Sequence, residues 1–281
     1  MTPDPLGTDA PPAGPDGYDA PHLGPDAPIE KMPVNWLLAR LGKRVLRPGG
    51  RELTEKLVAS LGVGPPDRVV ELAPGIGQTA RLLLAGRPGS YTGVERDPGA
   101  AAEVRAVVEP LGGVVVEGPA QHVPLDDACA TVVVGEAMLT MQNPANKAAI
   151  VGEAARLLAP GGRYAIHELC LRPDDLPEAV EGELVADLSR QTHVSTRPLR
   201  AEAWRRLLGD AGLEVIEEHR APMRLLSATR VVSDEGAGNA IATAMRAARD
   251  APARRRVLEI RAAFNRWQDH IEAIALIARR S

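Results

Sequence analysis

The chain has 281 residues, a net charge of −4, 44% hydrophobic residues and 2% aromatic residues. This length and hydrophobic content are sufficient for one large domain with a substantial core. The weakly acidic charge gives no general attraction to nucleic acids or anionic membranes, and the scarcity of aromatic residues argues against a surface that stacks single-stranded bases. No apolar run approaches the roughly 20 residues of a membrane span and no secretion signal is evident, so we expect a cytoplasmic protein.

The first part of the chain is expected to differ from the rest. Residues 1–28 are rich in proline, glycine, aspartate and alanine, which predicts a disordered tail; a tail that folds over the active site is the alternative. Residues 29–64 predict two helical pieces separated near Arg47 and the following Pro-Gly-Gly. These helices could pack on a sheet or form a lid that is hinged at this break.

The most informative stretch runs from Arg68 to Ala80. Its first residues, 68–72, are rich in β-branched side chains and predict a buried strand. A loop of small residues follows at 73–77, and residues 78–85 return to helical spacing. A glycine loop between a strand and a helix allows the backbone to approach a ligand closely, and a helix start exposes unpaired N–H groups.

Two classes of ligand use this geometry. Residues 75–80 match G-x-G-x-x-A, a dinucleotide-binding pattern, but Glu71 would place a negative charge beside a pyrophosphate. An acidic strand end favours a cationic ligand instead. Residues 71–77 resemble the first motif of the class I S-adenosylmethionine (SAM) dependent methyltransferases, with Ala73 in place of the first glycine. A tight turn that binds nothing is the alternative.

Two further segments carry the same resemblance, which extends from about residue 66 to 171. Residues 118–126 resemble the family's adenine-contacting segment, although Pro119 replaces its usual aspartate. Residues 158–162 read Leu-Ala-Pro-Gly-Gly, which resembles the Leu-x-Pro-Gly-Gly that joins the fourth helix to the fifth strand in these enzymes. Dinucleotide-dependent dehydrogenases generally lack that feature.

The fold class expected is α/β. The resemblance implies a Rossmann-like, doubly wound, seven-stranded sheet that is mostly parallel, with an antiparallel last strand and helices on both faces. We assign residues 65–281 to this domain, with helical insertions at about 172–200 and 222–270. The remaining strands are predicted at 90–95, 113–117, 131–135, 163–168, 213–217 and 273–278, and further helices at 98–108, 146–158 and 200–211.

Candidate site residues lie where strands end, because ligands of a doubly wound sheet bind beyond the carboxyl ends of its strands. Glu95 ends the second strand and is expected to accept hydrogen bonds from both ribose hydroxyls. The resemblance places Glu136 near the methyl group, and His167 is a candidate general base or, alternatively, a structural histidine. His193 and His219 are expected to lie away from the crevice. The predicted cofactor-binding residues are Glu71, Ala73, Pro74, Gly75, Gly77, Thr79, Glu95, Arg96, Ala120, Gln121 and Glu136.

The predicted function is transfer of the methyl group of SAM to a small-molecule acceptor by in-line displacement, without a metal. The insertion at 222–270 is rich in arginine, so a nucleic-acid or protein methyltransferase is an alternative. A SAM-binding protein without methyl transfer and a nicotinamide oxidoreductase are two others. No interaction with a membrane is expected, and a homodimer remains open.

Overall fold

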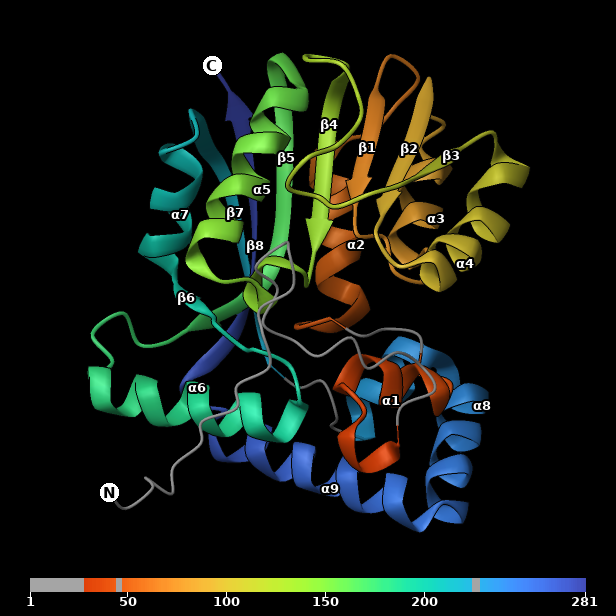
Figure 1. Cartoon of the computed structure of the whole chain (residues 1–281), viewed down its shortest axis with the longest axis vertical. Helices are drawn as coiled ribbons and strands as arrows, with labels where there is room; N and C mark the ends of the chain where they lie inside the picture. The colour runs from red at the N-terminus through yellow and green to blue at the C-terminus, as the bar shows by residue number, and fades with distance from the viewer. Residues whose placement is uncertain (1–27, 44–46, 224–227) are drawn as a thin grey trace, which may run out of the picture.

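The computed structural model describes residues 28–43, 47–223 and 228–281, so the tail predicted for residues 1–28 lies almost wholly outside the described part of the chain. A twisted sheet forms the centre of the molecule (Figure 1). Its strands lie in the order β3-β2-β1-β4-β5-β8-β7, and β6 pairs with β5 away from this path. Their bounds are β1 Arg68–Leu72, β2 Ser90–Glu95, β3 Val114–Glu117, β4 Ala130–Glu136, β5 Leu158–Leu171, β6 Leu199–Arg200, β7 Leu213–Pro222 and β8 Ile271–Arg280.

The strand directions agree with the expected fold. Strands β1 to β5 are parallel to one another, whereas β8 runs antiparallel to both β5 and β7. Each predicted strand is present, and the two-residue β6 is additional. The order changes direction between β1 and β4, so their carboxyl ends open a crevice at that point.

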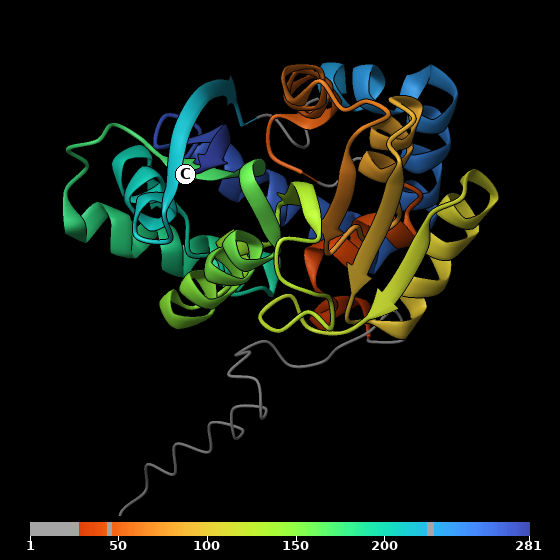
Figure 2. The same cartoon turned by 90° about the horizontal axis from the view of Figure 1, so that it is seen from above.

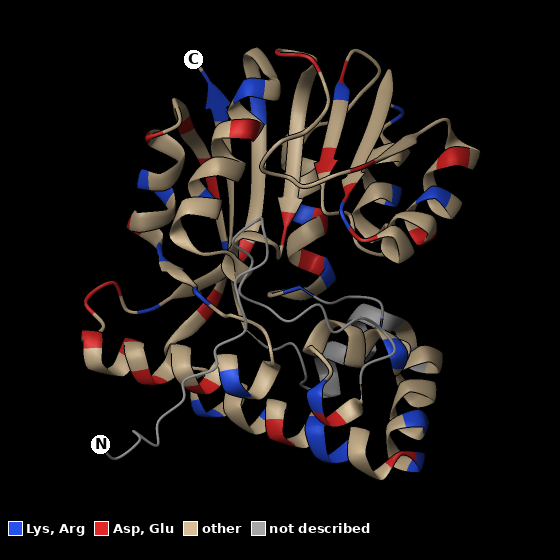
Figure 3. Ribbon diagram, in the orientation of Figure 1, with Lys and Arg blue, Asp and Glu red and all other residues tan. Residues whose placement is uncertain are grey.

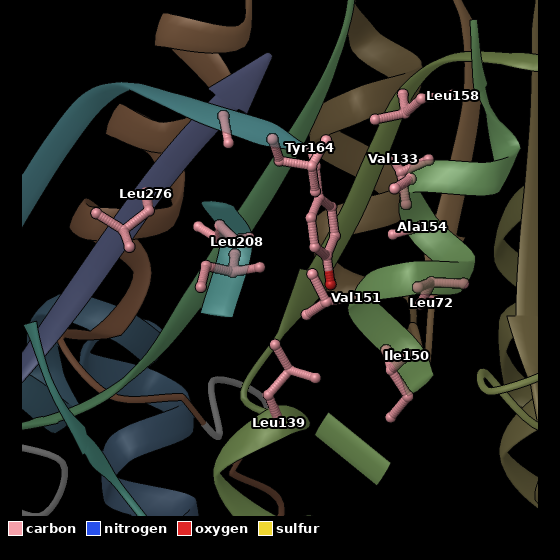
Figure 4. Packing of buried hydrophobic residues seen from close by; sticks show 14 of the residues in the cluster. Leu72, Val133, Leu139, Ile150, Val151, Ala154, Leu158, Tyr164, Leu208 and Leu276 are labelled. Carbon is pink, nitrogen blue, oxygen red and sulfur yellow. The ribbon is translucent and has the colours of Figure 1, made fainter. Parts of the chain in front are cut away.

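Helices cover both faces of the sheet (Figure 2). On one face, leucines of α2 and α3 pack with Val104 of α4 against the sheet, and on the other Ile150 of α5 and Trp204 of α7 do so. Figure 4 shows this second core around Tyr164. The helices are α2 Gly50–Leu61, α3 Gln78–Ala85, α4 Pro98–Val108, α5 Pro144–Leu157 and α7 Ala201–Gly209, with short 3-10 turns η2 Glu109–Leu111 and η3 Leu139–Met141.

A separate helical layer lies across the carboxyl ends of the parallel strands (Figure 1). It consists of η1 Ile29–Lys31, α1 Val34–Arg40, α6 Glu178–Thr192, α8 Ala228–Arg249 and α9 Ala251–Arg266. Leu37 and Leu41, at α1, pack with Ile260 of α9, so segments from both ends of the chain share one small core. None of the helices within the described residues has the length and apolar character that crossing a membrane requires.

The structure corrects one boundary. A break was expected between α5 and the fifth strand at Pro160-Gly-Gly162, but β5 already begins at Leu158, which pairs with Ala130. Gly161 adopts a left-handed φ of 75°, and a Cβ on Gly162 would lie 2.8 Å from the Ala159 carbonyl oxygen. The two glycines therefore bend a continuous strand rather than separating two elements.

Trp204 of α7 provides a test of the core. Its side chain is fully buried and its indole N–H donates to the Leu169 carbonyl (3.1 Å). We expect Trp204→Ala to lower the free energy of unfolding by about 3–5 kcal/mol, measured by urea denaturation. Leu111→Ala, at a side chain that is 57% exposed, is the control and should change it by less than about 0.5 kcal/mol. Equal effects of the two substitutions would contradict the assigned core.

Candidate functional site

A cavity of about 600 Å³ lies between the strand ends and the helical layer. Its walls come from the loop after β1, the ends of β2 and β4, the segment after β3, and α4, α1 and the end of α6. This volume falls within the range of pockets that hold small ligands. The cavity therefore occupies the position where a doubly wound sheet binds its ligand.

The loop at residues 73–77, between β1 and α3, forms one wall of this cavity and is called the glycine bend below. Ala73, Gly75 and Gly77 all have left-handed φ angles, of 52°, 61° and 73°. A Cβ built on Gly75 would meet no atom within 4 Å, so any side chain there would project into open space. Gly77 instead precedes α3 and lies against Val107, where a Cβ would come within 3.2 Å. The bend thus presents bare backbone to a ligand at Gly75 and packs against the protein at Gly77.

Glu95, at the end of β2, binds the backbone of the glycine bend. Its carboxylate accepts hydrogen bonds from the backbone N–H groups of Gly75 (3.3 Å), Arg96 (2.9 Å) and Asp97 (3.1 Å). Burial raises the pKa of Glu95, and these three hydrogen bonds oppose that effect. Among the described residues, the side chain is held at the cavity wall by these backbone N–H groups, and no cationic side chain pairs with it.

Glu71 lies on the adjacent strand and is almost completely buried. The Tyr91 hydroxyl donates to its Oε2 atom (2.6 Å). Burial raises the pKa of Glu71 to about 8; the Tyr91 hydrogen bond opposes this rise, and the charges of Glu136 and Glu95 add to it. Glu71 is therefore largely protonated near neutral pH in the ligand-free protein, although it lines the cavity.

Glu136, at the end of β4, lies at the centre of a network of hydrogen bonds and one ion pair. Arg47 and Thr79 donate to its Oε2 atom, while Thr54 (2.8 Å) and the Nδ1 of His167 (2.8 Å) donate to Oε1. Burial alone would raise the pKa of Glu136, but the charge of Arg47 and the donors together lower it to about 2. The network joins the N-terminal segment to the start of α3, the end of β4 and His167 within β5.

The structure brings most of the predicted residues together. Glu71, Ala73, Pro74, Gly75, Thr79, Glu95, Arg96, Ala120, Gln121 and Glu136 all line the cavity. Gly77 does not line the cavity, because it packs against Val107. His167 does not line it either, because its fully buried ring lies behind Glu136.

Of the two histidines expected away from the crevice, His219 bonds to Ser60 (3.0 Å) and Glu217 instead of lining the cavity. The expectation for His193 was wrong, because it lines the cavity from the end of α6. An insertion folded across the strand ends explains this, since it returns the chain to the crevice.

Sequence reasoning missed several lining residues. Asn35 and Trp36 reach the cavity from α1, and Met138, Met141 and Gln142 reach it from the segment after β4. That segment is held by Glu168, whose carboxylate accepts backbone N–H groups from residues 138–140 at 3.0, 2.7 and 2.9 Å. Its position directly after a strand of a doubly wound sheet is the sequence signal that could have identified it.

The N-terminal segment contacts both the sheet and the cavity. Helix α2 packs on the sheet through Leu53 and Leu57, whereas α1 covers the cavity. Arg47, between them, places its guanidinium against Glu136, with 12% of the side chain exposed. Arg47, which precedes α2, therefore lies at the cavity wall.

Comparisons with known proteins agree with this geometry. A methyltransferase-domain family model matches residues 70–166. An uncharacterized protein of Haemophilus influenzae is 32% identical over 204 residues, which cover 71% of this chain and 79% of that protein. Among solved structures, the [4+2]-cyclase SpnF superposes with a TM-score of 0.68 at 17% identity, covering 92% of this chain and 98% of SpnF.

A second similar structure is a geranyl diphosphate methyltransferase bound to geranyl diphosphate and sinefungin. Its TM-score is 0.60 at 17% identity, covering 82% of this chain and 77% of that chain. At these identities the two structures support the fold, while the matched family domain contains the glycine bend, Glu95 and Glu136. This chain therefore contains a class I SAM-dependent methyltransferase domain.

Proposed function

We propose that the methyl acceptor is a small molecule. The observation that supports this most strongly is the cavity itself, which α1 and the end of α6 cover opposite the strand ends. The arginine-rich insertion, which would have to face the crevice in a nucleic-acid methyltransferase, contributes no residue to the described cavity lining. The positive charges on the helical layer are visible in Figure 3.

Several of those arginines have structural partners. Arg246 donates to the Leu41 carbonyl (2.9 Å), Arg256 to the Gln191 carbonyl (2.8 Å) and Arg266 to Asp187 (2.7 Å). These contacts join α8 and α9 to α1 and α6. They account for part of the basic composition of the insertion without a nucleic-acid partner.

We propose that the cofactor lies along the strand ends, and the residues present fit it. The bare backbone at Gly75 leaves room for it, and Glu95 presents carboxylate oxygens that could accept from both ribose hydroxyls. Arg96, Ala120 and Gln121 would surround the adenine. Glu71 and Glu136 would face the positively charged methionine end, a placement that also disfavours a pyrophosphate and hence a nicotinamide dinucleotide.

SAM, when bound, supplies a methyl group on a sulfonium whose sulfur keeps the electron pair of the broken C–S bond and leaves as a neutral thioether. Glu136 is a weak base with its pKa near 2, so its proposed part is a fixed negative charge rather than proton removal. His167 donates Nδ1–H to Glu136 and holds it in place. The chain's main contributions are alignment of the reactants and exclusion of water by the helical layer.

The acceptor proposal can be tested with methyl-labelled SAM. The protein is incubated with a cell extract that has been separated by dialysis into a small-molecule fraction and a retained fraction of protein and RNA. We expect label to enter the small-molecule fraction with matching formation of S-adenosylhomocysteine. Label in the retained fraction would overturn the proposal, and an absence of S-adenosylhomocysteine with both fractions would favour a SAM-binding protein without methyl transfer.

Glu95 provides a test of cofactor placement. Two charge-assisted hydrogen bonds to ribose would be lost in Glu95→Ala, so we expect binding of S-adenosylhomocysteine to weaken by roughly 100-fold in calorimetry. Glu117→Ala is the matched control, because Glu117 ends the adjacent strand in register with Glu95 but does not line the cavity. An unchanged dissociation constant in folded Glu95→Ala protein would contradict the assignment.

A further inference from the structure

Arg47 and Glu136 form an ion pair in the wall of the cavity, and both residues line it. Only 12% of the Arg47 side chain and 6% of the Glu136 side chain are exposed, so little water screens the two charges. A cation and an anion in contact at a ligand-binding surface present opposite charges to the same part of a ligand. The pair therefore fits a ligand group that itself carries both charges.

The guanidinium of Arg47 uses one of its three nitrogen atoms in this network. Among the described residues, Nη1 donates to Glu136, to the Thr79 hydroxyl and to the Thr54 hydroxyl (3.3 Å). The Nε and Nη2 atoms carry further N–H groups in the same planar fork, which is suited to binding a carboxylate. Neither atom is among the buried atoms that lack a partner in the described part of the chain, so this edge of Arg47 has accessible surface.

The start of α3 favours an anion at the same place. Thr79, whose hydroxyl accepts from Arg47, lies in the first turn of this helix. The N-cap residue is Gly77, which has no side chain that could accept from the first N–H groups. Unpaired N–H groups and the helix dipole favour a negative group at a helix start. Arg47 and the start of α3 thus both favour an anion beside Thr79.

The strand order places Arg47 at one end of the crevice. Glu136 ends β4 on one side of β1, and Glu95 ends β2 on the other side. Neighbouring strands are about 4.8 Å apart, so the ends of β2 and β4 are separated by about 10 Å. Arg96, the other arginine in the described lining, directly follows Glu95 and belongs to the β2 end. Arg47 is therefore the lining arginine at the β4 end.

We propose that Arg47 binds the carboxylate of the cofactor's α-amino acid, while Glu136 faces the ammonium group on the same carbon atom. This inference rests on the proposed cofactor placement, in which Glu95 accepts from the ribose. An adenosyl group at the β2 end directs the amino-acid end toward β4, where the ion pair matches its two charges. Arg47 thereby makes the site selective for a cofactor with an intact amino acid. A carboxylate on the methyl acceptor is the other source of an anion for Arg47.

The test compares two ligands that differ only in the carboxylate. S-Adenosylhomocysteine carries the complete amino acid, whereas its decarboxylated analogue, S-adenosylthiopropylamine, keeps only the ammonium group. Each is titrated by calorimetry at neutral pH, without any acceptor, into the natural protein and into Arg47→Gln. We expect the natural protein to bind S-adenosylhomocysteine roughly 30-fold more tightly than the analogue, and Arg47→Gln to lower this preference by about tenfold.

The ratio of the two affinities isolates the carboxylate contact. Both ligands keep the ammonium group, so a change in binding caused by loss of the ion pair with Glu136 cancels in the ratio. Arg51→Gln is the matched control, because Arg51 pairs with Glu55 on the surface of α2 and does not line the cavity. This variant should keep the full preference.

Arg47→Lys is the second variant, for the case in which Arg47→Gln does not fold. A lysine keeps the charge but loses the forked donors, so its preference should be smaller than that of the natural protein. An undiminished preference in the Arg47 variants would overturn the inference and leave the cofactor site intact. Equal affinities of the two ligands for the natural protein would also overturn it and leave an acceptor carboxylate as the anion for Arg47. Failure of S-adenosylhomocysteine itself to bind would refute the proposed cofactor site, and the inference with it.

Discussion

Three buried carboxylates lie side by side at the ends of adjacent strands, and their charge is only partly balanced. Glu136 has the guanidinium of Arg47, whereas Glu95 is held by backbone N–H groups and Glu71 by one tyrosine hydroxyl. Burying a charge without a cation is costly, and the raised pKa of Glu71 reflects that cost. A positively charged ligand in the cavity would supply the missing balance, which fits SAM and disfavours a pyrophosphate.

The helical layer contributes α1 and the end of α6 to the wall of the same cavity. It carries α1 to the cavity, while Arg47 on the following segment reaches Glu136. On the other wall Glu168 holds the segment after β4 through three backbone N–H groups, which positions Met138 and Gln142. The strand ends thus contribute charged residues to the cavity wall, whereas α1 contributes no charged residue to the described lining.

Local patterns in the sequence were sufficient to predict the strands, the glycine bend and Glu95, because each depends on residues close together in the chain. The contacts that complete the site are long-range. Arg47 and Glu136 are 89 residues apart, and nothing near either residue signals their pairing. His193 reaches the cavity only because the insertion folds across the strand ends, and β6 has too few residues for a periodic pattern. His167 ends up behind Glu136 because β5 continues past it to Leu171.

The most direct test of the charge balance is the number of protons exchanged when SAM binds. Calorimetric titrations near pH 7, in buffers that differ in ionisation enthalpy, measure this number for the natural protein and for Glu71→Gln. A bound cation should ionise Glu71, so the natural protein should release up to about one more proton than the variant. Equal proton exchange in the two proteins, with SAM bound to both, would contradict the account.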